Sequence, residues 1–347
     1  MKGAGRRRGR DGGAWFIYSG KPRRRLPPVC PVASFPALPY HVFMRPGDFL
    51  SLVEIRTKVI SLSSFALGTL HAAWAQRAFS PLRGAVMMAA TLAVDMGTTA
   101  WNSYFDYLRD TDNPRFNREP DKVLVHGGIS PAAAFFVSLG LFAAAVPLGL
   151  AVAFLSGLWV VLVGALCMAV GFLYTGGPFP LSRTPLGELF AGGFLGSALF
   201  LISWGVQAAP AVSAEALGGA AAASLPSFIL VASILTVNNV CDIDGDRESG
   251  RRTLAILLGR KRGELLVYCM GAAAFSLAAV SAFAGNAPRG AAAAALVSAA
   301  YAAGEYGTMR RRGFGHATKG PNMGGILRVF TVFSLCRGAA YALALAR

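Results

Sequence analysis

Long apolar segments separated by short polar loops dominate the sequence from Phe49 to the C-terminus. Each segment approaches the roughly 20 residues that an α-helix needs to cross the hydrocarbon core of a bilayer. Because backbone polar groups find no water partner in lipid, helices are the expected structure for these segments. The pattern predicts nine spans, at about 49–71, 83–105, 131–155, 157–174, 186–206, 225–241, 263–284, 290–304 and 325–345.

The first 43 residues differ from the rest of the chain, because they are rich in Arg, Gly and Pro and carry no sustained apolar period. Such a composition predicts a disordered basic tail. No apolar stretch follows its charges directly, so it does not resemble a secretory signal. Two alternatives stay open: a translated tail, or translation that begins at Met44. We expect a tail over 1–43 and one all-α membrane domain over 44–347.

Composition supports the membrane assignment. The chain of 347 residues is 54% hydrophobic and only 14% charged, whereas a soluble domain is typically about 25% charged. The five cysteines are scattered without a CxxC pair, so neither disulfides nor a zinc site is expected. The net charge of +16 would suit nucleic acid, but the Lys and Arg residues lie in loops between apolar spans, which argues against a nucleic-acid partner.

The distribution of basic residues predicts the orientation of the spans. The loops after the second, fourth, sixth and eighth spans share one side and hold 15 Lys and Arg residues, against 4 on the opposite side. By the positive-inside rule the rich side is cytoplasmic. We therefore expect a multi-pass protein of the cell (inner) membrane, with the lipid bilayer as its surroundings.

Acidic residues concentrate at the cytoplasmic ends of two spans, and nine of the 17 lie in the two loops that follow them. Each cluster has the spacing i, i+4, i+8, which places its members on one face of a helix. The first cluster is Asn102, Asp106 and Asp110, and the second is Asn238, Asp242 and Asp246.

One acidic cluster at a helix end is often only a solvated face, but two clusters with matching spacing on one predicted side favour a joint site. Asp112 and Asp244 fall outside the i, i+4 register. For these two residues, a solvated or supporting role and metal ligation both stay open.

Two facing groups of carboxylates repel each other unless cations lie between them. Oxygen ligands without neighbouring Cys or His favour Mg2+ or Ca2+, and Mg2+ usually completes its shell with water and substrate phosphates. The same loops supply Arg109, Lys122, Arg247 and Arg251 for phosphate oxygens. The pattern therefore predicts a metal-bridged diphosphate at the mouth of a helical bundle whose interior holds an apolar tail.

This site suggests a reaction. Diphosphate on an allylic carbon leaves readily once its charge is neutralised, and an electron-rich aromatic ring can attack the resulting allyl cation. The protein must then exclude water with apolar and aromatic walls. The aromatic residues at suitable span ends are Trp101, Tyr104, Phe105, Phe172 and Tyr174.

Several charged residues outside the clusters allow two interpretations. Asp95 lies within the second span, where an ionisable residue is functional by default, yet it can also be a structural hydrogen-bond partner. Arg56 and Lys58 either extend to the membrane interface or contact the diphosphate. His126 and His316 lie in loops and are predicted to be bystanders.

The two clusters resemble the motifs of the UbiA superfamily of intramembrane aromatic prenyltransferases, which read Asn-Asp-xx-Asp-xxx-Asp and Asp-xxx-Asp. Here the first runs from Asn102 to Asp110, with Ser103 where the family usually has a second acid, and the second runs from Asp242 to Asp246. The likeness extends from about Val53 to the C-terminus.

Within that superfamily, the chain is most similar to the 1,4-dihydroxy-2-naphthoate, or MenA-like, branch. The stretches that carry this likeness are Tyr174–Pro178, with Gly187-Glu188 after it, Asn238–Arg247 and Gly250–Ala255. The segment from Lys122 to Gly128 departs from the Arg-Pro-Leu or Pro-Leu-Arg often seen in related enzymes.

The resemblance implies nine transmembrane helices around a central cavity and a Mg2+ cofactor. It implies transfer of a polyprenyl group from an all-trans polyprenyl diphosphate to 1,4-dihydroxy-2-naphthoate with loss of carbon dioxide, a step of menaquinone biosynthesis. Asp106, Asp110, Asp242 and Asp246 would be catalytic and, with Asn102, would bind metal. Substrate would contact Asn102, Lys122, Tyr174, Asn239, Arg247 and Arg251.

Two rival functions remain. The first is the same chemistry on another acceptor: 4-hydroxybenzoate, haem, a chlorophyllide or a glycerol-phosphate lipid. The second is a cation-coupled membrane transporter. Transporter carboxylates tend to lie near mid-bilayer in broken helices, whereas these lie at span ends beside many cations, which favours the enzyme. Prenyl chain length and oligomeric state are not specified by any residue that we identify.

Overall fold

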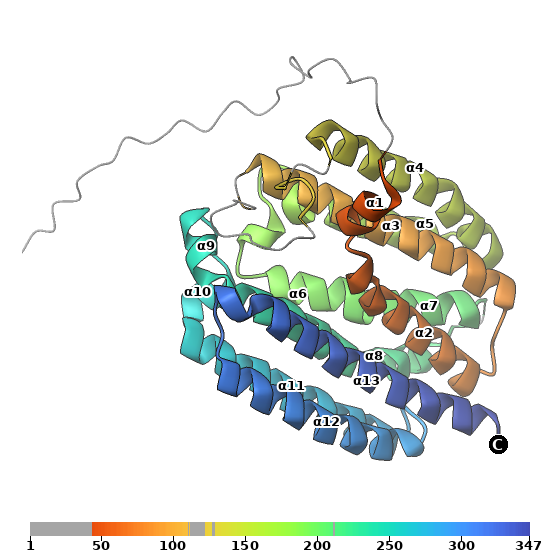
Figure 1. The fold of residues 1–347 in the computed structure, drawn as a ribbon. Coiled ribbons are helices and arrows are strands. Elements are labelled where there is room, and N and C mark those ends of the chain that lie inside the picture. Colours follow the sequence, from red (N-terminus) through yellow and green to blue (C-terminus); the bar gives the residue numbers. More distant parts are fainter. Residues whose placement is uncertain (1–43, 110, 112–121, 127–128, 211) are drawn as a thin grey trace, which may run out of the picture. The chain divides into compact units, whose positions relative to one another are not determined.

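The computed structural model describes residues 44–109, 111, 122–126, 129–210 and 212–347. The chain divides into two units, residues 1–40 and 41–347, and the tail predicted over 1–43 lies outside the described residues. Every regular element in the described part of the second unit is a helix (Figure 1). The all-α prediction is therefore confirmed for these residues.

A helix lies over each predicted apolar segment, although α8 begins at Ala214 and not near 225, and α13 begins at Lys319 and not near 325; short helical turns lie between the long helices. In chain order they are α1 (Pro46–Leu52), η1 (Ile55–Thr57), α2 (Lys58–Ala75), α3 (Pro81–Leu108), α4 (Pro131–Ser156), α5 (Trp159–Thr175), η2 (Leu181–Arg183), α6 (Gly187–Ala191), η3 (Gly192–Ala198), α7 (Leu199–Ala208), α8 (Ala214–Cys241), α9 (Ile243–Glu248), α10 (Leu254–Leu258), α11 (Arg260–Phe283), α12 (Gly290–Arg312), η4 (His316–Thr318) and α13 (Lys319–Leu345).

Local sequence signals fix several helix starts. The Ser80 and Ser130 side chains each accept a hydrogen bond from a backbone N–H in the first turn, and a proline follows each serine at the first helical position. A serine cap satisfies an orphan N–H, and proline needs no partner there. Ser213 caps α8 in the same way. These boundaries were readable from the sequence.

The first predicted span is interrupted, which the apolar pattern did not show. Glu54 adopts the left-handed conformation, with φ of 46°, and separates α1 from α2. Its carbonyl accepts hydrogen bonds from both the backbone N–H and the hydroxyl of Thr57, and its carboxylate pairs with Lys122 at 3.2 Å. These contacts offset the cost of about 1 kcal/mol or more that a non-glycine residue carries in this conformation.

Five helical segments in the described part of the chain are long and apolar enough to cross a bilayer: Pro131–Ser156, Gly187–Ala208, Ala214–Cys241, Arg260–Phe283 and His316–Leu345. The protein is therefore a multi-pass membrane protein. Helix α5 is apolar but shorter, and α2, α3 and α12 are not among the five. The prediction of nine crossings is thus met only in part. Helix α12 also runs past the predicted end at 304 to Arg312.

Neighbouring helices form a ring, because the series of helix–helix contacts closes on itself. Helix α3 packs on α2, α4 and α5, while α8 packs on η3, α11 and α13, and α13 returns to α2. The larger buried core joins α2, α7, α8, α11, α12 and α13 and contains Phe200, Trp204 and Phe330. A smaller core, with Met87 and Val152, joins α3, α4, α5 and α7. Residues from both cores line one cavity, so the ring encloses the site described below.

Two glycines allow the π-helical turn η3 to approach α8 closely. A Cβ built on Gly196 would lie 2.6 Å from Phe228 Cα, and one on Gly192 would lie 2.5 Å from the Phe228 carbonyl oxygen. Small residues of this kind let membrane helices pack backbone to backbone. Because Phe194 and Leu195 of the same turn line the cavity, this close contact positions part of its wall.

Gly196→Ala should lower the free energy of unfolding by about 1–3 kcal/mol, the usual cost of overpacking a tight interior. Thermal unfolding of the purified protein in detergent measures this effect. Gly193→Ala is the matched control, because its Cβ would meet only Phe228 Cε2 at 3.8 Å. Equal melting temperatures for the two variants would contradict the proposed backbone contact.

Candidate functional site

One cavity of about 1080 Å3 lies inside the helical ring. Ligand pockets of this type usually span about 300–1,000 Å3, so the cavity is large enough for a long ligand. Its lining changes from one end to the other. The charged end is formed by Asp106, Lys122, Asp242, Asp246, Arg251 and Lys319, and the apolar end by Met87, Val152, Val160, Leu199 and Ile202.

The two predicted acidic motifs meet at the charged end. Asp106 lies in the last turns of α3, and Asp246 lies in α9, far away in the sequence. Arg251 joins them, because its Nη2 is 3.1 Å from Asp106 Oδ1 and its Nη1 is 3.2 Å from Asp246 Oδ1. A planar guanidinium suits such a double contact. The ends of α3 and α9 are thus held around one cation.

Asp242, between α8 and α9, pairs with two side chains of its own, one from η4 and one from the start of α13. Lys319 Nζ lies 2.6 Å from Asp242 Oδ2, and His316 Nδ1 lies 3.2 Å from Asp242 Oδ1. The expectation that His316 is a bystander is therefore wrong. Sequence reasoning also missed Lys319, and the only available signal was its place in a basic loop on the predicted cytoplasmic side.

Asp246 is the most deeply buried carboxylate of the charged end, with 4% of its surface exposed. Its Oδ2 atom has no hydrogen-bond partner among the described residues. The pKa of Asp246 is raised to about 6, chiefly by burial and also by the Asp242 charge, while Arg251 and Lys319 oppose the shift. A carboxylate in this condition can accept a further cation.

The side chains of the charged end fit a metal ion only in part. Within the described residues, no group of three or more acidic, His or Cys side chains lies close enough to hold one. Asp110 lies outside those residues. The unpartnered Asp246 oxygen and the nearby Asp106 and Asp242 carboxylates are nonetheless the hard oxygen donors that Mg2+ prefers. Arg251 and Lys319 now occupy the space between these carboxylates.

The other predicted site residues divide into two groups. Asn102, Lys122 and Tyr174 line the cavity, and the Asn102 side-chain oxygen accepts a hydrogen bond from the Thr175 hydroxyl at 2.6 Å. Arg247 is exposed and does not line the cavity. Asn239 is also absent from the lining.

Asn239 is buried and donates a hydrogen bond to Glu188 Oε1 at 2.9 Å. This contact joins α8 to α6, so it positions the two helices. Asp244 is exposed and pairs with Arg260 at 2.8 Å, as a solvated residue would.

The aromatic wall differs from the prediction. Tyr174 lines the cavity, but Trp101, Tyr104, Phe105 and Phe172 do not; they pack against one another instead. Phe190 and Phe194 provide aromatic lining in their place. Two of these four aromatic residues join neighbouring helices. Trp101 Nε1 donates a hydrogen bond to the Phe172 carbonyl at 3.1 Å and so holds α5 against α3.

Arg109 anchors the stretch that follows Tyr174. Its guanidinium donates hydrogen bonds to the carbonyl of Thr175 and, at 2.8 Å, to the carbonyl of Gly177. Burial and the nearby Arg183 charge lower the pKa of Arg109. The sequence predicted a phosphate contact for Arg109, but here it holds the end of α5 beside the end of α3.

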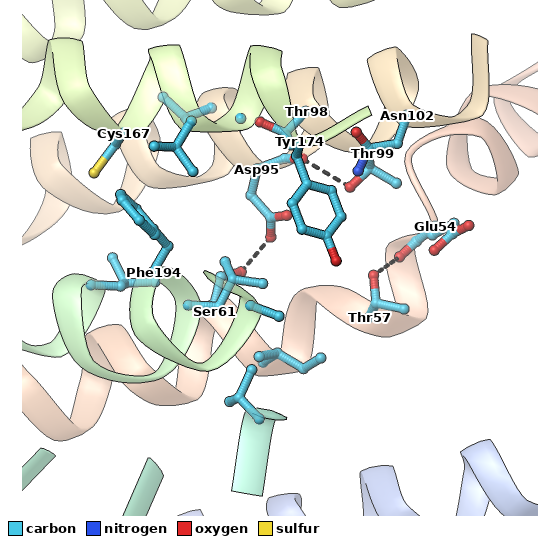
Figure 2. A pocket seen from close by; sticks show the side chains of 18 of the residues that line it. Glu54, Thr57, Ser61, Asp95, Thr98, Thr99, Asn102, Cys167, Tyr174 and Phe194 are labelled. Carbon is cyan, nitrogen blue, oxygen red and sulfur yellow. Dashed lines mark hydrogen bonds between the residues drawn. The ribbon is translucent and has the colours of Figure 1, made fainter. Parts of the chain in front are cut away.

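Asp95, which lines the cavity (Figure 2), forms an ion pair of 2.7 Å with Lys58. Lys58 also donates to the Thr99 hydroxyl at 2.7 Å, and Ser61 donates to Asp95 Oδ2 at 2.6 Å. Lys58 is 2% exposed and does not line the cavity. It therefore neither extends to the interface nor reaches the charged end, whereas Arg56 lines the cavity.

Comparison with known families and proteins gives a consistent match. The model of the UbiA prenyltransferase family matches residues 61–343. The chain is 35% identical to the 1,4-dihydroxy-2-naphthoate octaprenyltransferase of Bacillus subtilis over 192 residues, which is 55% of this chain and 58% of that one. The enzyme of the same name from Mycobacterium tuberculosis is 31% identical over 63% of this chain and 73% of its own.

A further relative is the digeranylgeranylglyceryl phosphate synthase of Halobacterium salinarum, 32% identical over 65% of this chain and 76% of its own. Among solved structures, a UbiA homologue from Archaeoglobus fulgidus bound to GPP and Mg2+ aligns with a TM-score of 0.62 at 17% identity, covering 86% of this chain and 100% of that one. A homologue from Aeropyrum pernix K1 aligns with a TM-score of 0.61 at 23% identity, covering 84% and 98%. These structures share the fold.

Arg251→Met should lower the free energy of unfolding by about 3 kcal/mol, because it leaves Asp106 and Asp246 without their shared cation. Added Mg2+ should then raise the melting temperature of this variant more than that of the wild type, since the metal no longer competes with the guanidinium. Arg252→Met is the control, because Arg252 is exposed and does not line the cavity. An equal response to Mg2+ in all three proteins would contradict the metal-site assignment.

Proposed function

We propose that this chain, which belongs to the UbiA prenyltransferase family, transfers a polyprenyl group from an all-trans polyprenyl diphosphate to 1,4-dihydroxy-2-naphthoate. One observation carries the proposal: Arg251 joins Asp106 and Asp246 at the charged end of a cavity whose opposite end is apolar. This polarity suits a substrate with a charged head and a long hydrocarbon tail.

The charged end would hold the diphosphate. Asp106, Asp242 and Asp246, with Asn102 and Asp110 from the family motif, would hold Mg2+ through carboxylate and amide oxygens. The bound metal would neutralise the leaving diphosphate. Lys122, Arg251 and Lys319 line the same end and would contact the remaining phosphate oxygens. The Archaeoglobus homologue with GPP and Mg2+ supports this assignment.

The chemistry then follows from the position of each group. The bond between the allylic carbon and its oxygen breaks, and the electron pair leaves with the diphosphate. The ring carbon that carries the carboxylate attacks the allyl cation, and loss of carbon dioxide restores the aromatic ring. Apolar side chains such as Val152 and Leu199 exclude water that would otherwise capture the cation. Tyr174 lines the cavity and would lie near the reacting carbon.

The choice of acceptor rests on the named relatives. The Bacillus and Mycobacterium enzymes are dihydroxynaphthoate octaprenyltransferases, which supports a naphthoate ring. The Halobacterium synthase aligns over a larger share of its own length, so a glycerol-phosphate lipid is the second candidate. 4-Hydroxybenzoate stays a rival that the assay below tests. All these relatives are named as transferases or synthases, and we do not propose transport.

The proposed location is the cell membrane, with the charged end at the cytoplasmic face. The concentration of Lys and Arg in the loops around that end supports this orientation. A diphosphate substrate and a Mg2+ ion would then enter from the cytoplasm, while the prenyl tail stays within the bilayer.

Membranes that contain this protein should form a prenylated naphthoquinol when supplied with dihydroxynaphthoate and an all-trans prenyl diphosphate, and chelation of Mg2+ should abolish the product. Mass spectrometry of extracted lipids detects it, with 4-hydroxybenzoate and a glycerol-phosphate lipid offered in parallel. If only 4-hydroxybenzoate is prenylated, the assignment of naphthoate as acceptor is wrong, whereas the assignment as a prenyltransferase still holds.

Asp106→Asn and Asp242→Asn should each reduce turnover at least about a hundredfold, because each removes a charge that stabilises the departing diphosphate. Initial rates in membranes with matched expression measure the effect. Asp244→Asn is the matched control, since this exposed residue pairs only with Arg260 among the described contacts. Near-normal rates in either motif variant would argue against the proposed metal ligands.

A further inference from the structure

A small polar patch lies between the two ends of the cavity. We define it as Ser61, Asp95 and Thr99, all of which line the cavity (Figure 2). Asp95 is about 10 Å along α3 from Asn102, or about two helical turns. The patch is therefore too far along the helix to belong to the charged end that would hold the diphosphate.

The hydrogen bonds within the patch determine what it offers a ligand. Lys58 donates to Asp95 Oδ1 and to the Thr99 hydroxyl, each at 2.7 Å. The Thr99 hydroxyl in turn donates to the Asp95 carbonyl at 2.9 Å, and Ser61 donates to Asp95 Oδ2 at 2.6 Å. The hydroxyl protons are thus already used. What remains for a ligand is the acceptor capacity of the carboxylate, which has about four lone-pair sites.

The ammonium group of Lys58 cannot contact a ligand in the cavity. The side chain of Lys58 is 3% exposed, while that of Asp95 is 13% exposed, and only Asp95 faces the cavity. Lys58 compensates the charge of Asp95 from behind. Of the two members of the ion pair, only the carboxylate is therefore presented to the cavity, which Arg56, Lys122 and Arg251 also line.

A purely structural ion pair does not need this arrangement. Removing two charges from water is costly, and their attraction repays this cost only when the geometry is good and further hydrogen bonds satisfy the remaining atoms. Ionisable residues within membrane segments are rare and usually mark a substrate path. Here one carboxylate face stays open to a cavity whose neighbouring wall includes the aromatic ring of Tyr174 (Figure 2).

We infer that Asp95 accepts a hydrogen bond from a hydroxyl group of the prenyl acceptor and thereby orients it in the cavity. The inference rests on the proposed function and extends it to a specificity-determining residue. An anionic group on the acceptor is repelled from Asp95 and attracted to the cationic side chains at the charged end. The acceptor is therefore held with its carboxylate toward the diphosphate and a hydroxyl toward Asp95.

This orientation defines the class of acceptor. Asp95 favours molecules that carry a hydroxyl donor opposite an anionic group, and it rejects molecules that would place a second anion at the patch. A dihydroxynaphthoate meets the requirement, and so does the free hydroxyl of a glycerol-phosphate lipid. The bond-forming step is unchanged, because Asp95 only positions the ring and no atom is transferred to it.

The test measures KM for each substrate separately. Asp95→Asn should raise KM for dihydroxynaphthoate about tenfold to a hundredfold, the range for losing a hydrogen bond to a charged group. KM for the prenyl diphosphate should stay within twofold. Thr91→Val is the control, because Thr91 lies one turn away on α3, lines the cavity and has no hydrogen-bond partner for its hydroxyl among the described residues.

A second variant distinguishes loss of the acceptor contact from misfolding of the protein. Lys58→Met with Asp95→Leu replaces the ion pair by apolar side chains of similar size, a change that is often neutral or stabilising. This double variant should show the same increase in KM for the acceptor. An acceptor KM within twofold of the wild type would overturn the inference.

Acceptor analogues test the wild-type protein directly. 1-Hydroxy-2-naphthoate and 4-hydroxy-2-naphthoate each lack one hydroxyl, and one of them should show kcat/KM at least tenfold below that of dihydroxynaphthoate. Asp95→Asn should remove this preference. If the wild type uses all three acceptors equally, the inferred role of Asp95 is wrong, whereas the proposed function still stands. Absence of transfer to any acceptor by the wild type would instead overturn the proposed function, and this inference with it.

Discussion

The ion pairs of Arg251 with Asp106 and Asp246 are the contact on which the site depends. Carboxylates that converge in a buried place repel one another unless cations separate them. The protein meets this constraint with side chains from distant parts of the chain, since Lys319 at the start of α13 serves Asp242 in the same way. The ends of α3, α9 and α13 are thereby gathered at one end of the cavity.

Some helices of the ring line the cavity, and others only pack against those that do. Helices α11 and α12 pack against α8 and α13 but contribute no residue to the cavity lining, whereas α3 supplies residues along its length, from Met87 to Asp106. One helix therefore passes the apolar end, the polar patch and the charged end in sequence. Under the proposed function, the diphosphate and the acceptor would therefore contact different turns of the same helix.

Much of the fold was predictable because helix formation in lipid is a local property. Apolar length predicted the helices, and the Ser-Pro pairs at 80–81 and 130–131 explain, once the structure is known, where α3 and α4 begin. The break at Glu54 was not predictable, because its stabilising partner Lys122 is distant in the sequence. The ion pairs across the site could not be predicted for the same reason. Lys319 and His316 read as ordinary loop residues, and the packing of Trp101 on Phe172 depends on how two helices face each other.

The pairing of Asp242 with Lys319 has a consequence for the order of events at the site. Without substrate, the carboxylates already carry internal counter-ions. If a magnesium diphosphate binds as proposed, the metal would take the carboxylates, and the side chains of Arg251 and Lys319 would turn to the phosphate oxygens. Binding would then be an exchange of ionic partners, because these carboxylates already pair with cationic side chains of the protein.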